Sequence, residues 1–174
     1  VSPLLVLVGM HYAFFPLSFN DLALKGSENV LGPGMLVSNI AQGGAVLCVS
    51  LKTKNRDLKQ LAGSAGLTAL LGITEPAMYG VTMKLKKPLI AVCSGGALAG
   101  LYIGLMGVVR YSSGAPGLAS IAIFIGENPM NIVHALIGCA IAFVSAFALT
   151  WIIGFEDPAN EDDQIEDESL EEVA

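Results

Sequence analysis

The sequence predicts an all-α, polytopic membrane protein with transmembrane helices and re-entrant hairpins, and three observations lead to this fold class. Apolar residues make up 53% of the 174 residues and charged residues only 14%, whereas soluble domains carry about a quarter charged residues. The segments 31–51, 88–109 and 131–154 contain no Asp, Glu, Lys or Arg, and each reaches the length of about 20 residues that a membrane-spanning helix needs. The basic residues gather mainly in short clusters between apolar segments, as in the loops of membrane proteins.

The acidic residues divide the chain into two predicted parts. The formal net charge is −6, but residues 156–174 hold ten of the fifteen acids and no base, so residues 1–155 carry a net charge of +4. We expect residues 1–155 to form the membrane body and residues 156–174 to form an acidic, disordered cytoplasmic linker. Because an apolar run opens the chain without a basic leader, we expect a fragment of a longer membrane protein whose first segment is a truncated helix.

Two basic clusters, 52–59 and 84–87, determine the predicted topology. Cytoplasmic loops attract Lys and Arg, so we place both clusters in the cytoplasm. The segment 61–83 between them then begins and ends on the same side, and we predict that it enters the membrane and returns as a re-entrant hairpin. Its turning point is Gly72-Ile73-Thr74-Glu75-Pro76, where the proline interrupts a helix.

The other elements follow in chain order from this assignment. The uncharged segment 4–19 runs outward, and a helix over 31–51 runs inward. A helix over 88–109 runs outward, and one over 131–154 returns to the cytoplasmic side. The segment 111–128 is broken by Gly and Pro, which leaves two interpretations, a second re-entrant segment or an extracellular stretch.

The remaining motifs indicate packing rather than cofactor chemistry. Gly96, Gly100 and Gly104 recur at four-residue spacing, which predicts close helix–helix contact in lipid. The sequence has no Walker-type glycine loop, zinc motif or nucleophile elbow. We therefore expect no cofactor, no metal and no nucleic-acid partner, and we expect no ATP hydrolysis by this chain.

Glu75 is the most informative single residue. A carboxylate inside an apolar segment costs several kcal/mol unless it is solvated or paired, so such residues are functional candidates by default. A carboxylate at a turn suits a polyhydroxylated ligand, because it accepts two hydroxyl groups and acts as a general base when its pKa is raised. The alternative is a structural glutamate that caps the turn.

His11 and Asn20 are weaker candidates in the first apolar segment. His11 is either a packed, hydrogen-bonded residue or part of a ligand pathway. Asn20 and Asp21 end the predicted segment, and they either contact a polar ligand or form the turn that follows it.

The run Gly72–Val81 resembles the GITEP signature of enzyme IIC, the sugar-transporting membrane domain of the bacterial phosphoenolpyruvate-dependent phosphotransferase system (PTS). The resemblance is to the glucose superfamily and most closely to β-glucoside-type transporters. Leu51–Lys59 and Val81–Pro88 resemble the family's runs on either side of this signature. Gly9–Tyr12 resembles its G-x-H-W stretch, with Tyr12 in place of the commoner Trp, and Gly154–Asp157 resembles its exit into the cytoplasmic linker. The match covers residues 1–157.

The resemblance implies a membrane domain that binds an external sugar and releases it after phosphorylation. The phosphate comes from a phosphocysteine on a IIB domain, which is loaded by IIA and HPr. Carried over, Glu75 binds sugar hydroxyls and helps to deprotonate the attacking 6-hydroxyl, and His11 is a second polar and catalytic contact. The predicted substrate site also includes Thr74, Pro76 and Asn20.

The same resemblance implies a homodimer in the bacterial inner membrane, an elevator-like movement of the sugar-binding half, and a cytoplasmic C-terminal tail. The first half of the family's membrane domain and the IIB and IIA domains lie outside this sequence, so we expect this chain alone to be inactive. We favour a β-glucoside as substrate. Two alternatives remain open, a proton-coupled sugar transporter with Glu75 as the proton site and a non-transporting membrane sensor.

Overall fold

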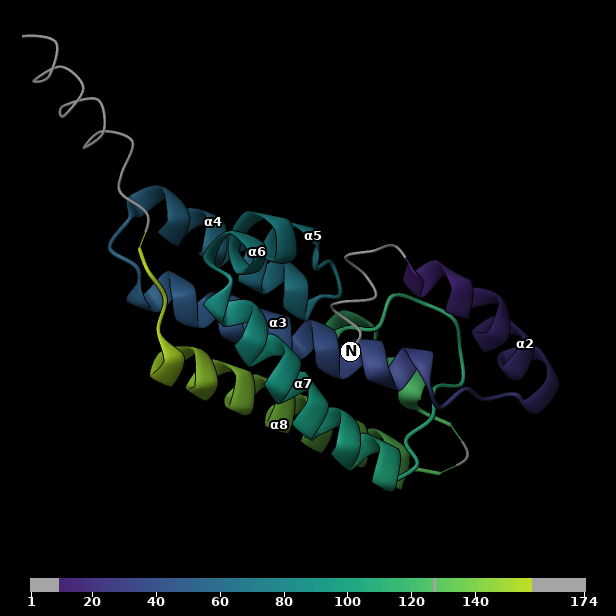
Figure 1. Cartoon of the computed structure of the whole chain (residues 1–174). Helices are drawn as coiled ribbons and strands as arrows, with labels where there is room; N and C mark the ends of the chain where they lie inside the picture. Colours follow the sequence, from purple (N-terminus) through teal and green to yellow (C-terminus); the bar gives the residue numbers. More distant parts are fainter. Residues whose placement is uncertain (1–9, 127, 158–174) are drawn as a thin grey trace, which may run out of the picture.

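The computed structural model describes residues 10–126 and 128–157, apart from the side chain of His11. The described residues form a bundle in which α3 is packed against α4, α7 and α8 (Figure 1). The elements in chain order are η1 (Met10–Phe14), α2 (Phe15–Lys25), α3 (Leu31–Lys52), α4 (Arg56–Leu70), α5 (Glu75–Ala77), η2 (Met78–Thr82), α6 (Met83–Leu85), α7 (Lys87–Leu105), η3 (Leu118–Phe124) and α8 (Met130–Ile153).

The three predicted membrane spans are confirmed by α3, α7 and α8, which are long and apolar enough to cross a bilayer. Their bounds agree with the predicted segments to within one residue, except that α7 ends at Leu105 instead of Val109. The early end has a local cause, because Gly107 adopts the left-handed conformation with φ at 64°. A left-handed glycine after the last turn is a common way to close a helix.

The first apolar segment differs from the prediction at its end. Asn20 and Asp21 were expected to end the segment, and this expectation is wrong because α2 continues to Lys25. The Lys25 ammonium lies 2.8 Å from the Asp21 carboxylate, one helical turn away, which favours the additional turn. Gly26 then closes the helix with φ at 69°.

Helix α3 occupies the centre of the bundle because small residues allow its neighbours to approach closely. Of the apolar stretch of α3, 72% is buried inside the protein, whereas the corresponding shares of α7 and α8 are 33% and 28%. A Cβ atom added at Gly44 would lie 2.7 Å from the carbonyl oxygen of Phe143 in α8, and one at Gly43 would lie 2.5 Å from the side chain of Leu70 in α4. The contact at Gly44 is with backbone and requires glycine, whereas the contact at Gly43 is with the flexible end of a leucine side chain.

The predicted glycine stripe on α7 does not make such a contact. A Cβ atom at Gly100 or Gly104 would meet nothing within 4 Å, and one at Gly96 would touch Ala41 only at 3.9 Å. Helix α7 instead approaches α8 through Gly95, where an added Cβ would lie 2.8 Å from the backbone nitrogen of Ala146. Periodicity identified glycines suited to close packing but did not show which of them lies at the crossing.

We expect Gly44→Ala to destabilise the bundle by about 1–3 kcal/mol, because the new methyl group overlaps backbone that cannot move without separating α3 from α8. Gly100→Ala is the matched control, since the site is open and alanine favours a helix by about 1 kcal/mol over glycine. Thermal unfolding in detergent measures both. Equal midpoints for the two variants would contradict the assigned crossing.

The predicted hairpin is present, and its tip falls at the predicted residues. Helix α4 runs away from the basic end of the bundle, the chain reverses at Gly72, and α5, η2 and α6 return beside α4 (Figure 1). Gly72 has φ at 107°, a conformation that favours glycine at the reversal. Pro76 lies in the first turn of α5, where its missing N–H costs no hydrogen bond, so it starts the returning arm.

The arms of this hairpin are too short to cross a membrane. The 15 residues of α4 span at most about 22 Å, against a hydrocarbon core about 30 Å thick. A hairpin of this length that starts at one face places its tip inside the membrane. The structure therefore agrees with a re-entrant segment over 61–83.

The segment after α7 forms a second hairpin, whose tip packs against α3 and the first hairpin, as expected for a re-entrant segment. The chain leaves α7, turns inward through η3, and returns to α8 at the same end. Asn39 Nδ2 in α3 donates a hydrogen bond of 2.8 Å to the carbonyl oxygen of Pro116 at the tip. At the base, Asn131 Nδ2 donates to the carbonyl oxygens of Val109 and Phe124 at 2.7 Å each.

Candidate functional site

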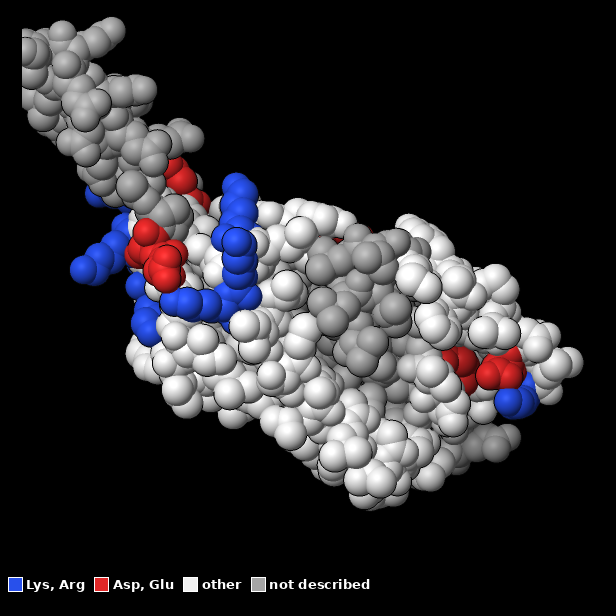
Figure 2. All heavy atoms as spheres, viewed as in Figure 1, with Lys and Arg blue, Asp and Glu red and all other residues white. Residues whose placement is uncertain are grey.

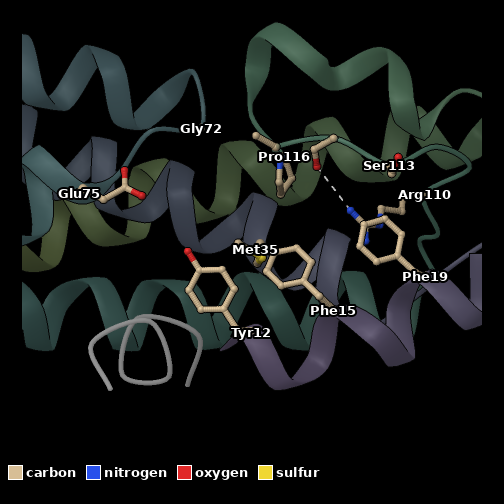
Figure 3. Close-up of a pocket in the computed structure, with 11 residues that line it drawn as sticks. Tyr12, Phe15, Phe19, Met35, Gly72, Glu75, Arg110, Ser113 and Pro116 are labelled. Atoms are coloured by element: carbon tan, nitrogen blue, oxygen red, sulfur yellow. Dashed lines mark hydrogen bonds between the residues drawn. The ribbon is translucent and has the colours of Figure 1, made fainter. Parts of the chain in front are cut away.

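The tips of the two hairpins meet and form one wall of a cavity of about 470 Å³. A Cβ atom at Gly117 would lie 2.4 Å from the backbone of Leu71, so the two turns are in direct contact. Figure 3 shows the cavity between these turns, α2 and the first part of α3. Its lining consists of aromatic, small and charged residues: Tyr12, Phe15, Phe19, Met35, Gly72, Glu75, Arg110, Ser113, Gly114, Ala115 and Pro116.

An aromatic wall, which we define as Tyr12, Phe15 and Phe19, faces the hairpin tips across the cavity (Figure 3). The centroid of the Phe15 ring lies 5.7 Å from that of Tyr12 and 6.1 Å from that of Phe19. The spacing of three and four residues places the rings on one helical face. The wall therefore presents a continuous apolar surface to a ligand.

Glu75 is the acidic group on the opposite side of the cavity (Figure 3). It begins α5, which continues through η2 and α6 to Leu85, so its negative charge lies at the positive end of this helical run. Within the described part of the chain, its carboxylate makes no hydrogen bond or ion pair, and the side chain is exposed to the cavity. Its acceptor capacity is therefore available to a ligand.

Arg110 supplies a basic group at the other end of the cavity, and its position is determined by a buried ion pair. Its Nε lies 2.8 Å from Oε2 of Glu28, and the two side chains are only 4% and 1% exposed. The backbones of Arg110 and Glu28 also exchange two hydrogen bonds, of 2.8 and 2.9 Å. Arg110 Nη2 donates to the hydroxyl of Ser18 at 2.5 Å, which ties α2 to the second hairpin.

Glu28 also accepts hydrogen bonds from the backbone N–H groups at the start of α3. Its Oε1 accepts from the backbone N–H of Val30 at 2.7 Å and also from that of Leu31, and its Oε2 accepts from Gly32 at 2.8 Å. The first N–H groups of a helix have no partner within the helix, so this carboxylate serves as a cap. One carboxylate thus stabilises α3 and positions Arg110 beside the cavity.

The structure brings together only part of the predicted site. Glu75 lines the cavity, while Thr74 is buried and Pro76 is exposed beside it, and neither contributes to the lining. Asn20 is exposed on α2 next to Phe19 and lies outside the lining. His11 belongs to η1, and its side chain lies outside the described part of the structure.

The aromatic wall and Arg110 were not among the predicted site residues. The wall has a sequence signal, the i, i+3, i+7 spacing of aromatic residues in the first segment. Arg110 and Glu28 each stand alone at the edge of a long uncharged segment, which is a weaker signal. Nothing in the sequence pairs these two residues, because their contact depends on how α3 and α7 meet.

Residues 1–96 match the family model described as "Phosphotransferase system, EIIC". This chain belongs to the EIIC family. The matched part includes Tyr12, Phe15, Phe19 and Glu75, whereas Arg110 and the second hairpin follow it. The resemblance inferred from Gly72–Val81 is thereby confirmed, as is the all-α membrane fold.

Curated relatives of this EIIC chain are components of sugar-specific systems. It is 44% identical over 162 residues to a PTS system beta-glucoside-specific EIIBCA component of Bacillus subtilis (strain 168), which covers 92% of this chain and 26% of the relative. It is 43% identical to an arbutin-, cellobiose-, and salicin-specific EIIBC component of Escherichia coli (strain K12), over 89% of this chain and 32% of the relative. It is 40% identical to a sucrose-specific EIIBC component of Bacillus subtilis (strain 168), over 92% of this chain and 34% of the relative.

This EIIC chain therefore spans about a quarter to a third of the length of these relatives. No solved structure matches it. The cavity places the GITEP carboxylate, Glu75, within one site together with the aromatic wall and Arg110. Such a site combines an apolar platform with a free hydrogen-bond acceptor and, at its other end, a buried basic group.

Proposed function

We propose that this chain is the sugar-binding half of a phosphotransferase permease, which binds an external sugar and releases it into the cytoplasm as a sugar phosphate. The observation that carries the proposal is the Glu75 carboxylate, which has no partner among the described residues and faces the aromatic wall across a cavity of about 470 Å³. Ligand pockets are typically about 300–1,000 Å³ in volume. Residues 1–155 form this membrane half, and residues 156–174 form its cytoplasmic linker.

The two sides of the cavity match the two kinds of surface on a sugar. We expect the apolar C–H face of a pyranose ring to stack on the rings of the aromatic wall. Glu75 accepts hydrogen bonds from two hydroxyl groups, and bonds to a charged acceptor are the stronger kind. The relatives' names favour a glucoside as substrate, and we propose a β-glucoside.

The chemical step is transfer of a phosphoryl group from a cysteine of a IIB domain to the sugar. The S–P bond breaks and an O–P bond forms at the 6-hydroxyl of the sugar. Glu75 accepts the proton that this hydroxyl loses, and the cysteine leaves as a thiolate. General bases of this kind contribute about 10²- to 10⁴-fold to a rate.

The positions of the charges support a cytoplasmic location for the end of the bundle at which α8 finishes. Both basic clusters lie there, beside the first acids of the tail (Figure 2), and cytoplasmic loops are enriched in Lys and Arg. The IIB domain would approach this end. We further propose a homodimer in the bacterial inner membrane, with IIA and HPr as the upstream phosphate donors.

The product of uptake tests the proposed function. We expect the natural full-length protein, in vesicles supplied with its phosphorylated IIB domain, to deliver labelled β-glucoside only as the phosphate ester. The measurement is chromatography of the vesicle contents. Accumulation of free sugar that an uncoupler abolishes would instead establish the proton-coupled alternative, with Glu75 as the proton site.

The proposed orientation has its own test. A cysteine introduced at Lys54, which is exposed in the loop before α4, should react with a membrane-impermeant maleimide only after the cytoplasmic face is opened. A cysteine at Ser113, exposed in the second hairpin, should show the opposite sidedness or require an open outward cavity. Labelling of position 54 in intact cells would contradict the orientation.

A further inference from the structure

Seven of the nine Lys and Arg residues gather at one end of the bundle, where α3 ends and α7 begins (Figure 2). We call this surface the basic rim, and it consists of Lys52, Lys54, Arg56, Lys59, Lys84, Lys86 and Lys87. The end of α8 also reaches this surface, because Lys52 Nζ donates a hydrogen bond of 2.9 Å to the carbonyl oxygen of Trp151. The chain therefore leaves α8 directly beside the basic rim.

A cavity of about 480 Å³ in the basic rim brings lysines and the start of the acidic tail together. Lys84, Lys86 and Lys87 line it on one side, and Glu156 and Asp157 line it on the other. Lys84 and Lys86 are exposed and form no ion pair within the described residues. The cavity thus holds cationic groups whose charges are not balanced by the part of the chain described.

The first two acids of the tail are already bound to the basic rim. Glu156 Oε1 lies 3.0 Å from Lys87 Nζ, and the hydrogen bond and charge of this lysine lower the pKa of Glu156 below its ordinary value. Asp157 Oδ2 accepts from the backbone N–H of Lys54 at 2.7 Å, and Oδ1 accepts from the hydroxyl of Thr53. These contacts fix the point from which residue 158 continues.

The segment that continues from this point is complementary to the basic rim in charge and sufficient in length. Residues 158–174 contain eight Asp and Glu residues and no Lys or Arg. Seventeen residues reach up to about 56 Å when extended, so every lysine of the rim lies within range. A segment tethered beside its binding site has an effective concentration in the millimolar range. Even weak ion pairs therefore form in a large fraction of the molecules.

We propose that the acidic segment 158–174 binds the basic rim of the same chain, so that an acidic or phosphorylated partner must displace it. The contact is electrostatic and multivalent rather than a single fixed geometry. Displacement by a phosphorylated IIB domain rests on the proposed function, whereas the contact within the chain does not. The acidic segment then competes with partners for the basic rim. A partner that carries a phosphate group has a higher local charge density and displaces it more readily.

Zero-length carbodiimide crosslinking tests the contact in the natural full-length protein. In low salt we expect amide bonds between Lys84 or Lys86 and acids of 161–172, identified by mass spectrometry. In about 0.5 M salt the yield should fall several-fold, because the Debye length drops from about 10 Å at 0.1 M to a few Å. Isotopically light and heavy chains are mixed, and crosslinks only between copies would overturn the proposal.

Lysine reactivity with an amine-acetylating reagent is the second measurement. Replacing the eight acids of 161–172 with Asn and Gln should raise the acetylation rates of Lys84 and Lys86 about threefold or more, as expected for a contact with a Kd near 1 mM. A variant with the same residues in shuffled order should keep the native rates, because it keeps the charge. Lys25, at the opposite end of the bundle, is the internal control. Equal rates in the native and neutralised proteins would overturn the proposal.

Binding of a phosphorylated partner separates this proposal from the proposed function. If the acidic segment competes for the basic rim, neutralising it should strengthen the binding of a phosphorylated IIB domain about threefold or more. Loss of the intramolecular crosslinks alone would reject the contact but leave sugar phosphorylation unaffected. Intact crosslinks together with free sugar as the uptake product would reject the permease mechanism but leave the contact in place.

Discussion

Replacing Glu75 with Gln should weaken sugar binding by about 100-fold. The amide keeps the shape of the side chain but loses the charge, and each hydrogen bond to a charged group contributes about 1.5–3 kcal/mol. Two weakened hydroxyl contacts therefore correspond to a Kd about two orders of magnitude higher. Equilibrium binding of a labelled β-glucoside to the natural full-length protein in detergent measures this effect.

The phosphorylation rate should decrease further, because glutamine does not accept the proton of the attacking hydroxyl. Asp57→Asn is the matched control, since it removes one negative charge from the exposed start of α4 at the other end of the hairpin. We expect this control to leave sugar binding unchanged. An unaltered Kd in Glu75→Gln would show that Glu75 does not bind the sugar.

The buried pair between Glu28 and Arg110 should have the second largest effect, in this case on stability. Glu28→Gln or Arg110→Met alone leaves one buried charge without its oppositely charged partner, which costs about 3–5 kcal/mol. The double variant should cost much less than the sum, because two apolar or neutral groups replace the pair. Unfolding of the four proteins in detergent gives the coupling energy between the two residues.

The same variants also report on the cavity. Arg110 holds Ser18 of α2 and lines the cavity, so Arg110→Met should weaken sugar binding in addition to lowering stability. Lys25→Met is the control, because its pair with Asp21 is exposed and contributes only about 0.2–0.5 kcal/mol. Additive costs for Glu28 and Arg110 would contradict a coupled pair.

The three spans and the hairpin were predictable because they depend on properties summed along a continuous stretch of chain. A run of about 20 apolar residues enters a membrane whatever its neighbours are. Positive charges at both ends of 61–83 predict that the segment returns, and the reversal falls at Gly72, within the predicted turning point, while Pro76 starts the returning arm. Glu75 was identifiable for the same reason, as an isolated charge in an apolar segment.

The residues that complete the cavity were not predictable in this way. Asn39 holds the second hairpin through Pro116, 77 residues away, and Arg110 contacts Ser18 across 92 residues. Such contacts depend on the relative placement of several helices, which hydropathy and spacing do not specify. The helix crossing was not predictable for the same reason. Gly95, rather than Gly96, Gly100 or Gly104, lies where α7 crosses α8.

The sequence by itself determined the membrane spans, the returning hairpin, the charged ends and the carboxylate at the hairpin tip. Each of these follows from local transfer free energies and from backbone preferences of single residues. Only the tertiary structure decided that Glu75 faces an aromatic wall, that Arg110 is held by Glu28, and that the second hairpin returns to meet the first. These features arise from contacts between segments far apart in the chain, because packing brings their side chains to one place.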